Sequence, residues 1–473
     1  MNIPICKNSK NHKDMKTKAI IHAIVLGFSA VMLASCINGN PGNGGKPAAQ
    51  QNAPAAAASD NAAAASTSQN ASQQGTAVGA NIYPFSANPV VNVYLETSGS
   101  MNGYVNGGTS VFQQVVKEYL SGINNGNFAQ SVNYFYINNK ITPKGTDLTN
   151  YITRLTPSSF AAAGGGATTD IGGLFKAILE KTDNNTISIF ISDCIISPGS
   201  NSNTAAYANG QMTDVRNAII GYINQYQDLA CLVYQFDSGF NGRYFDFQNK
   251  PHKVNMQRPF YIWVFGHTYN IAKLKLEVVP DQDFKVAPIR NQWMIFNTRL
   301  DYLQKDGVFY GLMLPNNMKN GKYTHVDRTV LRSIQKGPDG NFRFSFGANM
   351  GLAATLMGDS YIEDTNNYNK IVNKATRELF YGEIEKDYNQ RSPYSHSFRV
   401  DSDSPFQKGT FTLAFIPKVP SWAYECTDVD DHVFNGDNDN KTYGLKYIFD
   451  GVFSGYNNAG HANILTEFNF EIK

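Results

Sequence analysis

Charged residues are scarce in this chain. Asp, Glu, Lys and Arg make up only 16% of its 473 residues, and the formal net charge is +2. An average soluble protein has about a quarter of such residues. No tract dense in Lys and Arg follows the N-terminal segment. This balance gives no reason to expect a nucleic acid or a strongly acidic partner.

Cysteine is equally scarce, with five residues. Cys6 and Cys36 lie in the N-terminal segment, which leaves Cys194, Cys231 and Cys426, so at least one thiol has no partner within the chain. Cys194 follows one predicted strand and Cys231 begins the next, which places them too far apart for a bridge. With no Cys-x-x-Cys or Cys/His zinc spacing, we expect buried, unpaired thiols rather than a disulfide framework or a zinc site.

The motifs of several enzyme classes are also missing. There is no Gly-x-Ser-x-Gly nucleophile turn, no phosphate-binding loop with its Lys, no Gly-x-Gly-x-x-Gly after a strand and no His-Glu-x-x-His. The histidines are scattered. The sequence therefore favours a binding protein over an enzyme.

The N-terminus has the pattern of a bacterial lipoprotein signal. Lysines precede an apolar stretch over residues 19–34, which is short for a membrane span and ends in Leu33-Ala34-Ser35-Cys36. This ending resembles a lipobox, which implies removal of residues 1–35 and acylation of Cys36. Met15 is a more typical start for such a signal than Met1. Acyl chains anchor a protein to a membrane without spanning it. Ile37 after the Cys, in place of Asp, favours the outer membrane in lipoproteins of this kind, on either of its faces.

Residues 36–82 begin with the acylated Cys and continue as a low-complexity stretch of Asn, Ala, Gln, Gly, Pro and Ser without an aromatic residue. Such a composition cannot bury enough apolar surface to offset the entropy of ordering. We predict a disordered tether with an r.m.s. span of about 35–40 Å, which lifts the following domain away from the lipid.

From about residue 88, apolar strand-like runs alternate with amphipathic helical stripes, the pattern of an α/β fold with a doubly wound sheet. The strand-like runs are 90–95, 131–138, 187–191, 232–236 and 260–265. In such sheets, ligands bind at the carboxyl ends of the strands. We assign residues 83–280 to this domain and expect its site at that edge.

Hydroxyl and carboxylate side chains stand at three points where a predicted strand ends or a helix begins. Glu96, Ser98 and Ser100 follow the first strand, Thr169 precedes a helix, and Asp193 follows the strand 187–191. Oxygen ligands gathered from three loops suit a hard ion such as Mg²⁺.

This arrangement resembles the metal-ion-dependent adhesion site of the von Willebrand factor type A (vWA) family. The family's pattern is Asp-x-Ser-x-Ser after the first strand, a Thr before a middle helix and an Asp that ends the next buried strand. The resemblance implies a Rossmann-like vWA domain in which Ser98, Ser100 and Thr169 are ligands and Asp193 binds through water. It also implies one open coordination position that takes a carboxylate from a protein partner.

Two positions leave alternatives open. Thr168 competes with Thr169, although the run 169–172 matches the family's Thr-x-Ile-Gly better. Glu96 stands where the family has Asp, and the additional methylene displaces the carboxylate, a distortion that Mg²⁺ tolerates poorly. The alternatives are therefore a bound Mg²⁺, Mn²⁺ or Ca²⁺, with Glu96 in the ligand set, or a site without metal.

Beyond residue 280 the alternation fades, and short strand-like runs separated by turn residues follow. The runs 329–335 and 342–346 flank Gly-Pro-Asp-Gly, a hairpin signal, and further strands are expected at 397–400, 410–416 and 465–472. Residues 368–386 and 443–456 are ambiguous between helix and strand. We predict that residues 281–473 form a mainly β, sandwich-like domain.

An acidic loop lies in this second part. Asp428, Asp430 and Asp431 are followed by Asp437 and Asp439, but the spacing lacks the Gly and the Glu of a calcium-binding EF-hand loop. We predict a solvated turn.

Three functions remain. The favoured one is a membrane-anchored extracytoplasmic adhesion protein that engages a protein partner through a metal ion. The second is a metal-independent structural or assembly subunit of an envelope complex. The third is an envelope hydrolase in which an ion activates water, for which the sequence shows no general base.

Overall fold

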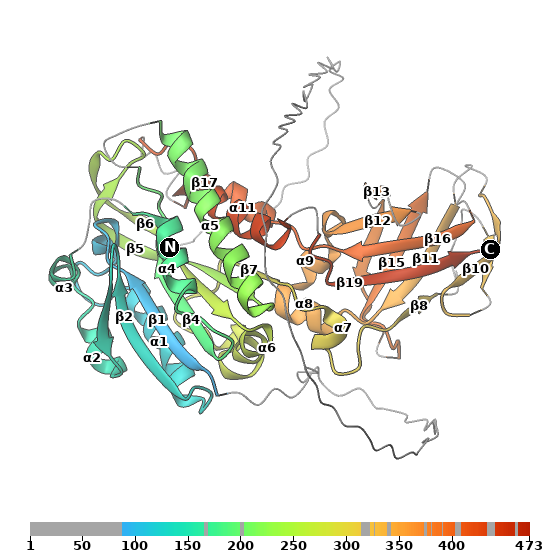
Figure 1. Ribbon diagram of the computed structural model, residues 1–473, viewed down its shortest axis with the longest axis horizontal. Helices are drawn as coiled ribbons and strands as arrows, with labels where there is room; N and C mark the ends of the chain where they lie inside the picture. Colours follow the sequence, from blue (N-terminus) through green and yellow to red (C-terminus); the bar gives the residue numbers. More distant parts are fainter. Residues whose placement is uncertain are drawn as a thin grey trace, which may run out of the picture. The chain divides into compact units, whose positions relative to one another are not determined.

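The computed structural model describes residues 88–473, except 165–168, 199–202, 314–321, 326, 338–341, 373–375, 380, 390, 403–407, 433–439 and 459–461. The predicted signal peptide, Cys36, the tether and Thr168 lie outside the described residues. Within them the fold is mixed α/β, with sheets of seven, six, four and two strands (Figure 1). No helix of the described residues has both the length and the apolar character needed to cross a membrane.

The seven-stranded sheet has the strand order β3-β2-β1-β4-β6-β5-β7. Its centre is parallel, because β1 pairs in parallel with both β2 and β4, whereas the other pairs are antiparallel. β4 is buried along its whole length, as expected for a central parallel strand. The strands are β1 (Val90–Glu96), β2 (Ser131–Ile137), β3 (Ile141–Gly145), β4 (Thr186–Ser192), β5 (Ala230–Phe245), β6 (Pro251–Gly266) and β7 (Asn291–Phe296).

Helices cover both faces of this sheet. α1 (Val111–Asn125) begins with a capping box between Ser110 and Gln113, and its Phe112 packs on Phe260 of β6. α4 (Ile171–Leu179) places Phe175 against Trp263 and Phe265 of the same strand. Residues 260 and 263 point to opposite faces of a strand, so α1 and α4 lie on opposite sides of the sheet. α5 (Thr204–Tyr226) lies beside α4.

The prediction of parallel strands at 232–236 and 260–265 is wrong in one respect. These runs belong to β5 and β6, two strands of 16 residues each that pair antiparallel in register from Ala230↔Gly266 to Phe245↔Pro251. A parallel pair needs a crossover of a dozen or more residues, usually a helix, and residues 237–259 are strand and turn. The parts 236–245 and 251–260 pair only with each other among the described strands. We call them the arm.

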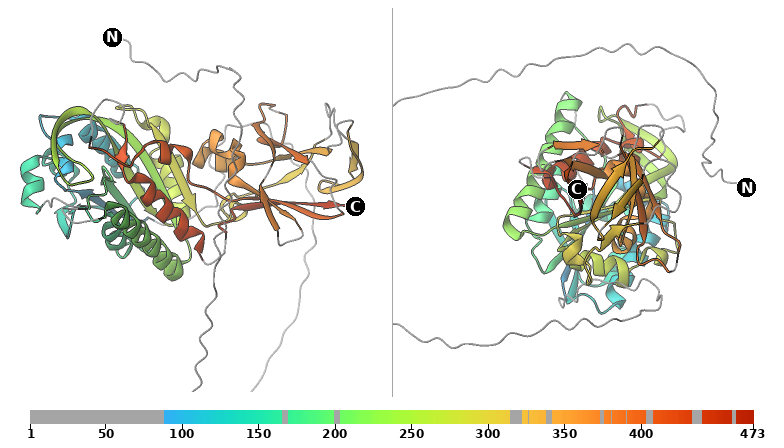
Figure 2. Two further views of the ribbon diagram at one scale, coloured as in Figure 1. Left: turned by 90° about the horizontal axis from the view of Figure 1, so that it is seen from above. Right: turned by 90° about the vertical axis from the view of Figure 1, so that its right-hand side faces the viewer.

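The predicted domain boundary at residue 280 also differs from the structure. β7 completes the seven-stranded sheet by pairing with β5. Later in the chain, α11 (Leu445–Tyr456) packs along α5, as Figures 1 and 2 show. Its Phe449 contacts both Trp263 and Trp293. Residues from beyond 281 are therefore part of the core that surrounds the first sheet.

Two glycines let α11 approach α5 closely. A Cβ on Gly451 would lie 2.7 Å from the carbonyl oxygen of Met212, and one on Gly455 would lie 2.6 Å from Ile219 Cβ. These positions are four residues apart, so both face the same neighbouring helix.

We therefore expect Gly455→Leu to lower the free energy of unfolding by about 1–3 kcal/mol through overpacking. Gly210→Leu on α5 is the control, because a Cβ there meets nothing within 4 Å. Urea unfolding followed by tryptophan fluorescence gives both values. Equal effects of the two substitutions would show that the helices do not pack through Gly455.

The acidic loop is not a solvated turn throughout. Asp431 is buried, and its carboxylate accepts hydrogen bonds from the Tyr244 hydroxyl and from the backbone N–H of Phe247, 2.7 Å away. Asp428 is buried as well. Burial raises the pKa of Asp431 to about 6. This loop ties the C-terminal part of the chain to the arm. Asp437 and Asp439 lie outside the described residues.

The remaining strands form a six-stranded sheet, β13-β12-β16-β19-β10-β9, and a four-stranded sheet, β14-β15-β11-β8. The sheets contact each other through aromatic rings, for example Phe346 against Phe468 and Phe470. Their strands are β8 (Tyr310–Leu312), β9 (Lys322–His325), β10 (Val330–Gln335), β11 (Phe342–Ala348), β12 (Tyr368–Val372), β13 (Thr376–Leu379), β14 (Gly382–Lys386), β15 (His396–Ser402), β16 (Gly409–Phe415) and β19 (Thr466–Ile472).

The hairpin predicted around residues 337–340 is wrong. β10 belongs to the six-stranded sheet and β11 to the four-stranded one, so the two strands do not pair with each other. Of the two ambiguous segments, 368–386 holds strands and 443–456 holds α11. The strands β17 (Thr427–Asp428) and β18 (Thr442–Tyr443) form the smallest sheet. The short helices are η1 (Ser100–Tyr104), α2 (Leu148–Thr153), α3 (Pro157–Ala162), α6 (Thr268–Lys273), η2 (Leu274–Val278), η3 (Asp281–Asp283), α7 (Leu300–Leu303), α8 (Gly351–Met357), α9 (Asp359–Glu363), η4 (Thr365–Asn367) and α10 (Ser421–Glu425).

Candidate cation site

The segments predicted to carry the site end at one edge of the seven-stranded sheet. β1 ends at Glu96 and β4 at Ser192, and the two strands are parallel neighbours with Leu95 opposite Ile191. Thr169 precedes Asp170, which caps α4 by accepting a hydrogen bond from the Gly173 N–H at 3.0 Å. Parallel pairing thus brings residues about 100 positions apart in the sequence to the same edge.

Hydrogen bonds join the predicted ligands to one another. The Thr169 hydroxyl donates to Glu96 Oε1 at 2.9 Å, and the Ser98 and Ser100 hydroxyls lie 2.9 Å apart. The Ser192 hydroxyl donates to Glu96 Oε2. Both oxygens of Glu96 therefore have a hydroxyl partner. Ser192 was not among the predicted site residues, although its position at the end of a buried strand beside Asp193 is visible in the sequence.

Asp193 lies beside this group, and one of its oxygens is unpartnered. Its Oδ1 accepts a hydrogen bond from the Ile195 N–H at 3.3 Å, whereas Oδ2 is buried and has no hydrogen-bond partner among the described residues. Cys194 follows with a φ of +57°, and its N–H donates to Ser192 Oγ at 2.8 Å. A non-glycine residue in this conformation is uncommon and marks a sharp change of direction. The backbone therefore changes direction immediately after Asp193.

Burial dominates the electrostatics of the two carboxyl groups. Glu96 is 0% exposed and Asp193 is 1% exposed. Burial, and next the charge of Asp193, raise the pKa of Glu96 to about 7. Burial also raises the pKa of Asp193, against the effect of the neighbouring Ser100 hydroxyl. Two buried carboxylates so close together require compensation by a cation or by a proton.

The sequence prediction missed Arg258, a buried cation near the site. Arg258 lies on the arm, is 3% exposed and stacks 4.5 Å above the Tyr244 ring. Its charge opposes the rise that burial causes in the pKa of Asp193. The arm is held against η1, where Tyr104 donates a hydrogen bond to the Pro259 carbonyl at 2.6 Å. In the sequence, Arg258 stands two residues before the predicted apolar run 260–265.

The donor set fits a hard divalent cation. It contains only oxygens, it includes the unpartnered Asp193 Oδ2, and it carries two carboxylates. The described residues contain no group of three or more His, Cys, Asp or Glu side chains arranged to hold a metal. The candidate site consequently depends on hydroxyls for three of its five predicted ligands.

The three cysteines of the described residues, Cys194, Cys231 and Cys426, are buried and unpaired, which confirms the sequence prediction. Trp263 donates its indole N–H to Cys194 Sγ at 3.3 Å. Burial raises the pKa of Cys194, so this thiol stays protonated next to the site. It is a packing residue and not a thiolate ligand.

Comparison with family models, with curated proteins and with solved structures finds no match to this chain.

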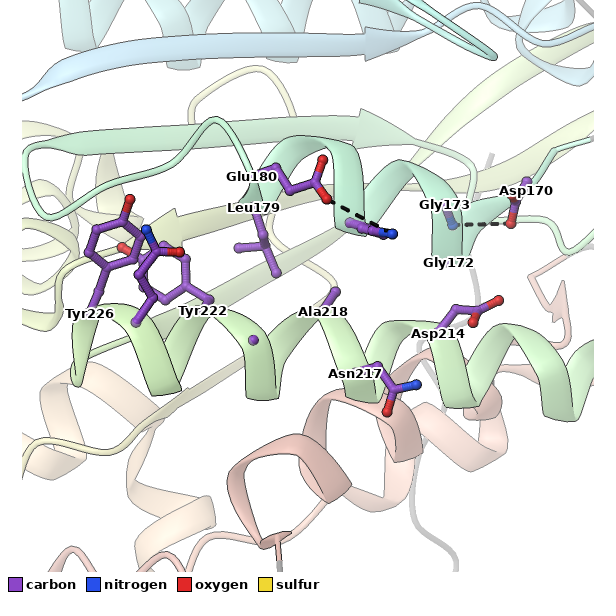
Figure 3. Close-up of a pocket in the computed structure, with 13 residues that line it drawn as sticks. Asp170, Gly172, Gly173, Leu179, Glu180, Asp214, Asn217, Ala218, Tyr222 and Tyr226 are labelled. Carbon is purple, nitrogen blue, oxygen red and sulfur yellow. Dashed lines mark hydrogen bonds and ion pairs between the residues drawn. The ribbon is translucent and has the colours of Figure 1, made fainter. Parts of the chain in front are cut away.

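A separate cavity of about 680 Å³ lies between α4 and α5 (Figure 3). Asp170 and Asp214 lie at one end of it, and Tyr222 and Tyr226 at the other. The two tyrosine rings are 4.8 Å apart. Tyr222 is 3% exposed, and its hydroxyl has no hydrogen-bond partner among the described residues.

We expect Tyr222→Phe to raise the free energy of unfolding by about 1 kcal/mol, because it removes a buried hydroxyl without a partner. Tyr456→Phe is the matched control. The Tyr456 hydroxyl donates to the Leu229 carbonyl at 3.0 Å, so its removal leaves a buried acceptor unsatisfied and lowers stability. Chemical denaturation measures the change in the free energy of unfolding for both variants. A loss of stability in Tyr222→Phe would contradict this account of the cavity.

Proposed function

We propose that this chain is a lipid-anchored binding protein of the bacterial cell envelope, held at the outer membrane through Cys36. Its N-terminal α/β part is proposed to be a vWA-like domain that engages a protein partner through a bound divalent cation, and not an enzyme. The observation that carries the proposal is the convergence of Glu96, Ser98, Ser100, Thr169 and Asp193 at one edge of the sheet, with Asp193 Oδ2 unpartnered.

In this proposal Ser98, Ser100 and Thr169 hold Mg²⁺, or Mn²⁺ or Ca²⁺, and Glu96 and Asp193 balance its charge. The ion supplies electrostatic attraction for a carboxylate of the partner protein. The Ser192 hydroxyl donates a hydrogen bond to Glu96 Oε2 and so orients this carboxylate, as hydrogen-bonded neighbours of metal ligands commonly do. Glu96 accepts one hydrogen bond from the Thr169 hydroxyl and one from the Ser192 hydroxyl. These two bonds fix the position of its carboxylate, whose side chain is one methylene longer than that of Asp.

One observation favours a second candidate, a metal-independent scaffold subunit of an envelope complex. All five predicted ligands are at most 6% exposed, and Arg258 already places a positive charge beside Asp193. In this alternative Arg258 and a proton on Glu96 provide the compensation that a metal ion would otherwise provide.

Thermal unfolding separates the two candidates. We expect 1 mM Mg²⁺ or Mn²⁺ to raise the Tm of the full chain in detergent by several degrees relative to EDTA, because a ligand that binds only the folded state stabilises it. Thr169→Ala and Asp193→Ala should abolish the difference. Thr153→Ala is the control, because this exposed hydroxyl lies outside the site. An unchanged Tm of the native chain with either ion would favour the scaffold.

A further inference from the structure

A cavity of about 520 Å³ opens beside Gly99, the residue between Ser98 and Ser100. It lies where η1 meets the arm, and it does not include any of the predicted cation ligands. A volume of this size is within the range of small-molecule sites in proteins. Its lining is Gly99, Asn102, Asn106, Pro157, Asn241, Gly242, Arg243, Phe245 and Lys253.

The lining carries two positive charges and no negative one. Arg243 and Lys253 are directly opposite each other in the antiparallel register of β5 and β6, so their side chains leave the same face of the arm. Like charges directly opposite each other destabilise a strand pair. Among the described residues, no carboxylate forms an ion pair with either of them. An anion that binds between the two side chains would compensate their positive charges.

The rest of the lining is suited to hydroxyl groups. Asn106 Nδ2 donates to the Asn241 carbonyl at 2.9 Å, which joins the segment that follows η1 to the arm. Asn102 Nδ2 donates to the Gly99 carbonyl at 3.2 Å, while its Oδ1 is buried without a partner among the described residues. Amide side chains both donate and accept hydrogen bonds. The exposed amides of Asn106 and Asn241 can therefore bind the hydroxyl groups of a small polar ligand.

Phe245 adds an apolar surface to this cavity. It is partly exposed and lies on the same face of β5 as Arg243 and Asn241, because residues two apart on a strand point the same way. A ligand here meets a cationic pair, amides and one aromatic ring. We propose that the cavity binds an anionic sugar, with its carboxylate or phosphate between Arg243 and Lys253 and its hydroxyls on the asparagines.

An acidic peptide meets the charge requirement and also carries hydrogen-bond donors, but a cavity of about 520 Å³ has the size of a small-molecule site, which favours the sugar. The guanidinium of Arg243 matches carboxylate and phosphate equally well in geometry. The proposal is independent of the cation site, since none of the lining residues is a predicted metal ligand.

Isothermal titration of the full chain in detergent tests the proposal, with glucuronic acid, glucose 6-phosphate, glucose and inorganic phosphate as probes. We expect at least one of the two anionic sugars to bind 10-fold or more tightly than both glucose and phosphate, with the same affinity in EDTA. The sugar that binds shows whether the site prefers a carboxylate or a phosphate group. Arg243→Gln and Lys253→Gln should each weaken that binding 10-fold or more. Lys250→Gln, an exposed lysine of the adjoining turn, is the control.

A stability measurement distinguishes a binding role from a merely structural one. Without ligand, Arg243→Gln should raise the Tm by roughly 1–2 °C, because it relieves the repulsion, and 1 M salt should remove this gain. With the anionic sugar, the native chain should become the more stable of the two. Equal affinity for glucose and the anionic sugars, equal affinity for phosphate, tighter binding of a glutamate hexapeptide, or unchanged binding in both variants would overturn the proposal.

Discussion

A chain that ends at residue 280, the boundary predicted from the sequence, will not fold into a stable α/β domain. It lacks β7, which completes the sheet, and α11, which covers α5. Five apolar side chains of α11 are at most 7% exposed: Leu445, Ile448, Phe449, Val452 and Tyr456. Burial of a large apolar side chain contributes about 1.5–3 kcal/mol, so their loss costs about 7–15 kcal/mol. The whole stability of a typical domain is about 5–15 kcal/mol.

Near-UV circular dichroism and urea unfolding test this expectation on residues 88–280 and on the full chain. The full chain should unfold cooperatively, and the shortened one should show neither a near-UV signal nor a cooperative transition. In the full chain, Phe449→Ala should lower the free energy of unfolding by about 3–5 kcal/mol, because Phe449 contacts three tryptophans. A cooperative transition in residues 88–280 would show that α11 is dispensable to the sheet.

Without metal, the chain should lose stability as the pH rises from 4.5 to 7. The pKa of Glu96 is about 7 in the folded chain and 4.5 as its ordinary value. Between these values the folded state holds a proton that the unfolded state has released, so the stabilising contribution is full below pH 4.5 and is lost as the pH passes 7. The difference corresponds to about 3 kcal/mol. Asp431, with a pKa of about 6, adds a smaller loss at lower pH.

Glu96→Gln supplies the control for this pH dependence. The amide removes the buried charge and keeps one acceptor oxygen for the Thr169 or the Ser192 hydroxyl, while its NH2 group donates to the other hydroxyl. In EDTA, the variant should be more stable than the native chain at pH 8 and should lack the fall near pH 7. Mg²⁺ should flatten the native profile as well, because the ion takes over the role of the proton. The same slope in native chain and variant would place the titrating group elsewhere.

The sequence was sufficient for those parts of the structure that local patterns determine. The strands that end at Glu96 and Ser192 were predicted from continuous apolar runs, and the helix α4 from the apolar stripe that follows Thr169. Parallel neighbours end at the same edge, so the proximity of Glu96 and Asp193 was expected from the strand assignment, whereas the family resemblance placed Thr169 beside them.

Long-range pairing explains what could not be predicted. β7 resembles any short strand, and only its pairing with β5 assigns it to the first sheet. The α11 segment was ambiguous between helix and strand because aromatic residues are mixed with glycines in it. The role of these glycines, which is to let α11 approach α5 closely, depends on a neighbour that is distant in the sequence. Arg258 became visible as part of the site only once the antiparallel register of the arm placed it near Asp193.

Direct titration of the full chain with Mn²⁺, followed by the electron paramagnetic resonance signal of the free ion, tests the central claim. We expect one Mn²⁺ to be taken up per chain, Mg²⁺ to displace it, and Thr169→Ala and Asp193→Ala to leave the added ion free. If the signal of free Mn²⁺ equals the total at every ratio, or if both variants take up the ion as the native chain does, the oxygen cluster at the end of β1 and β4 is not a cation site.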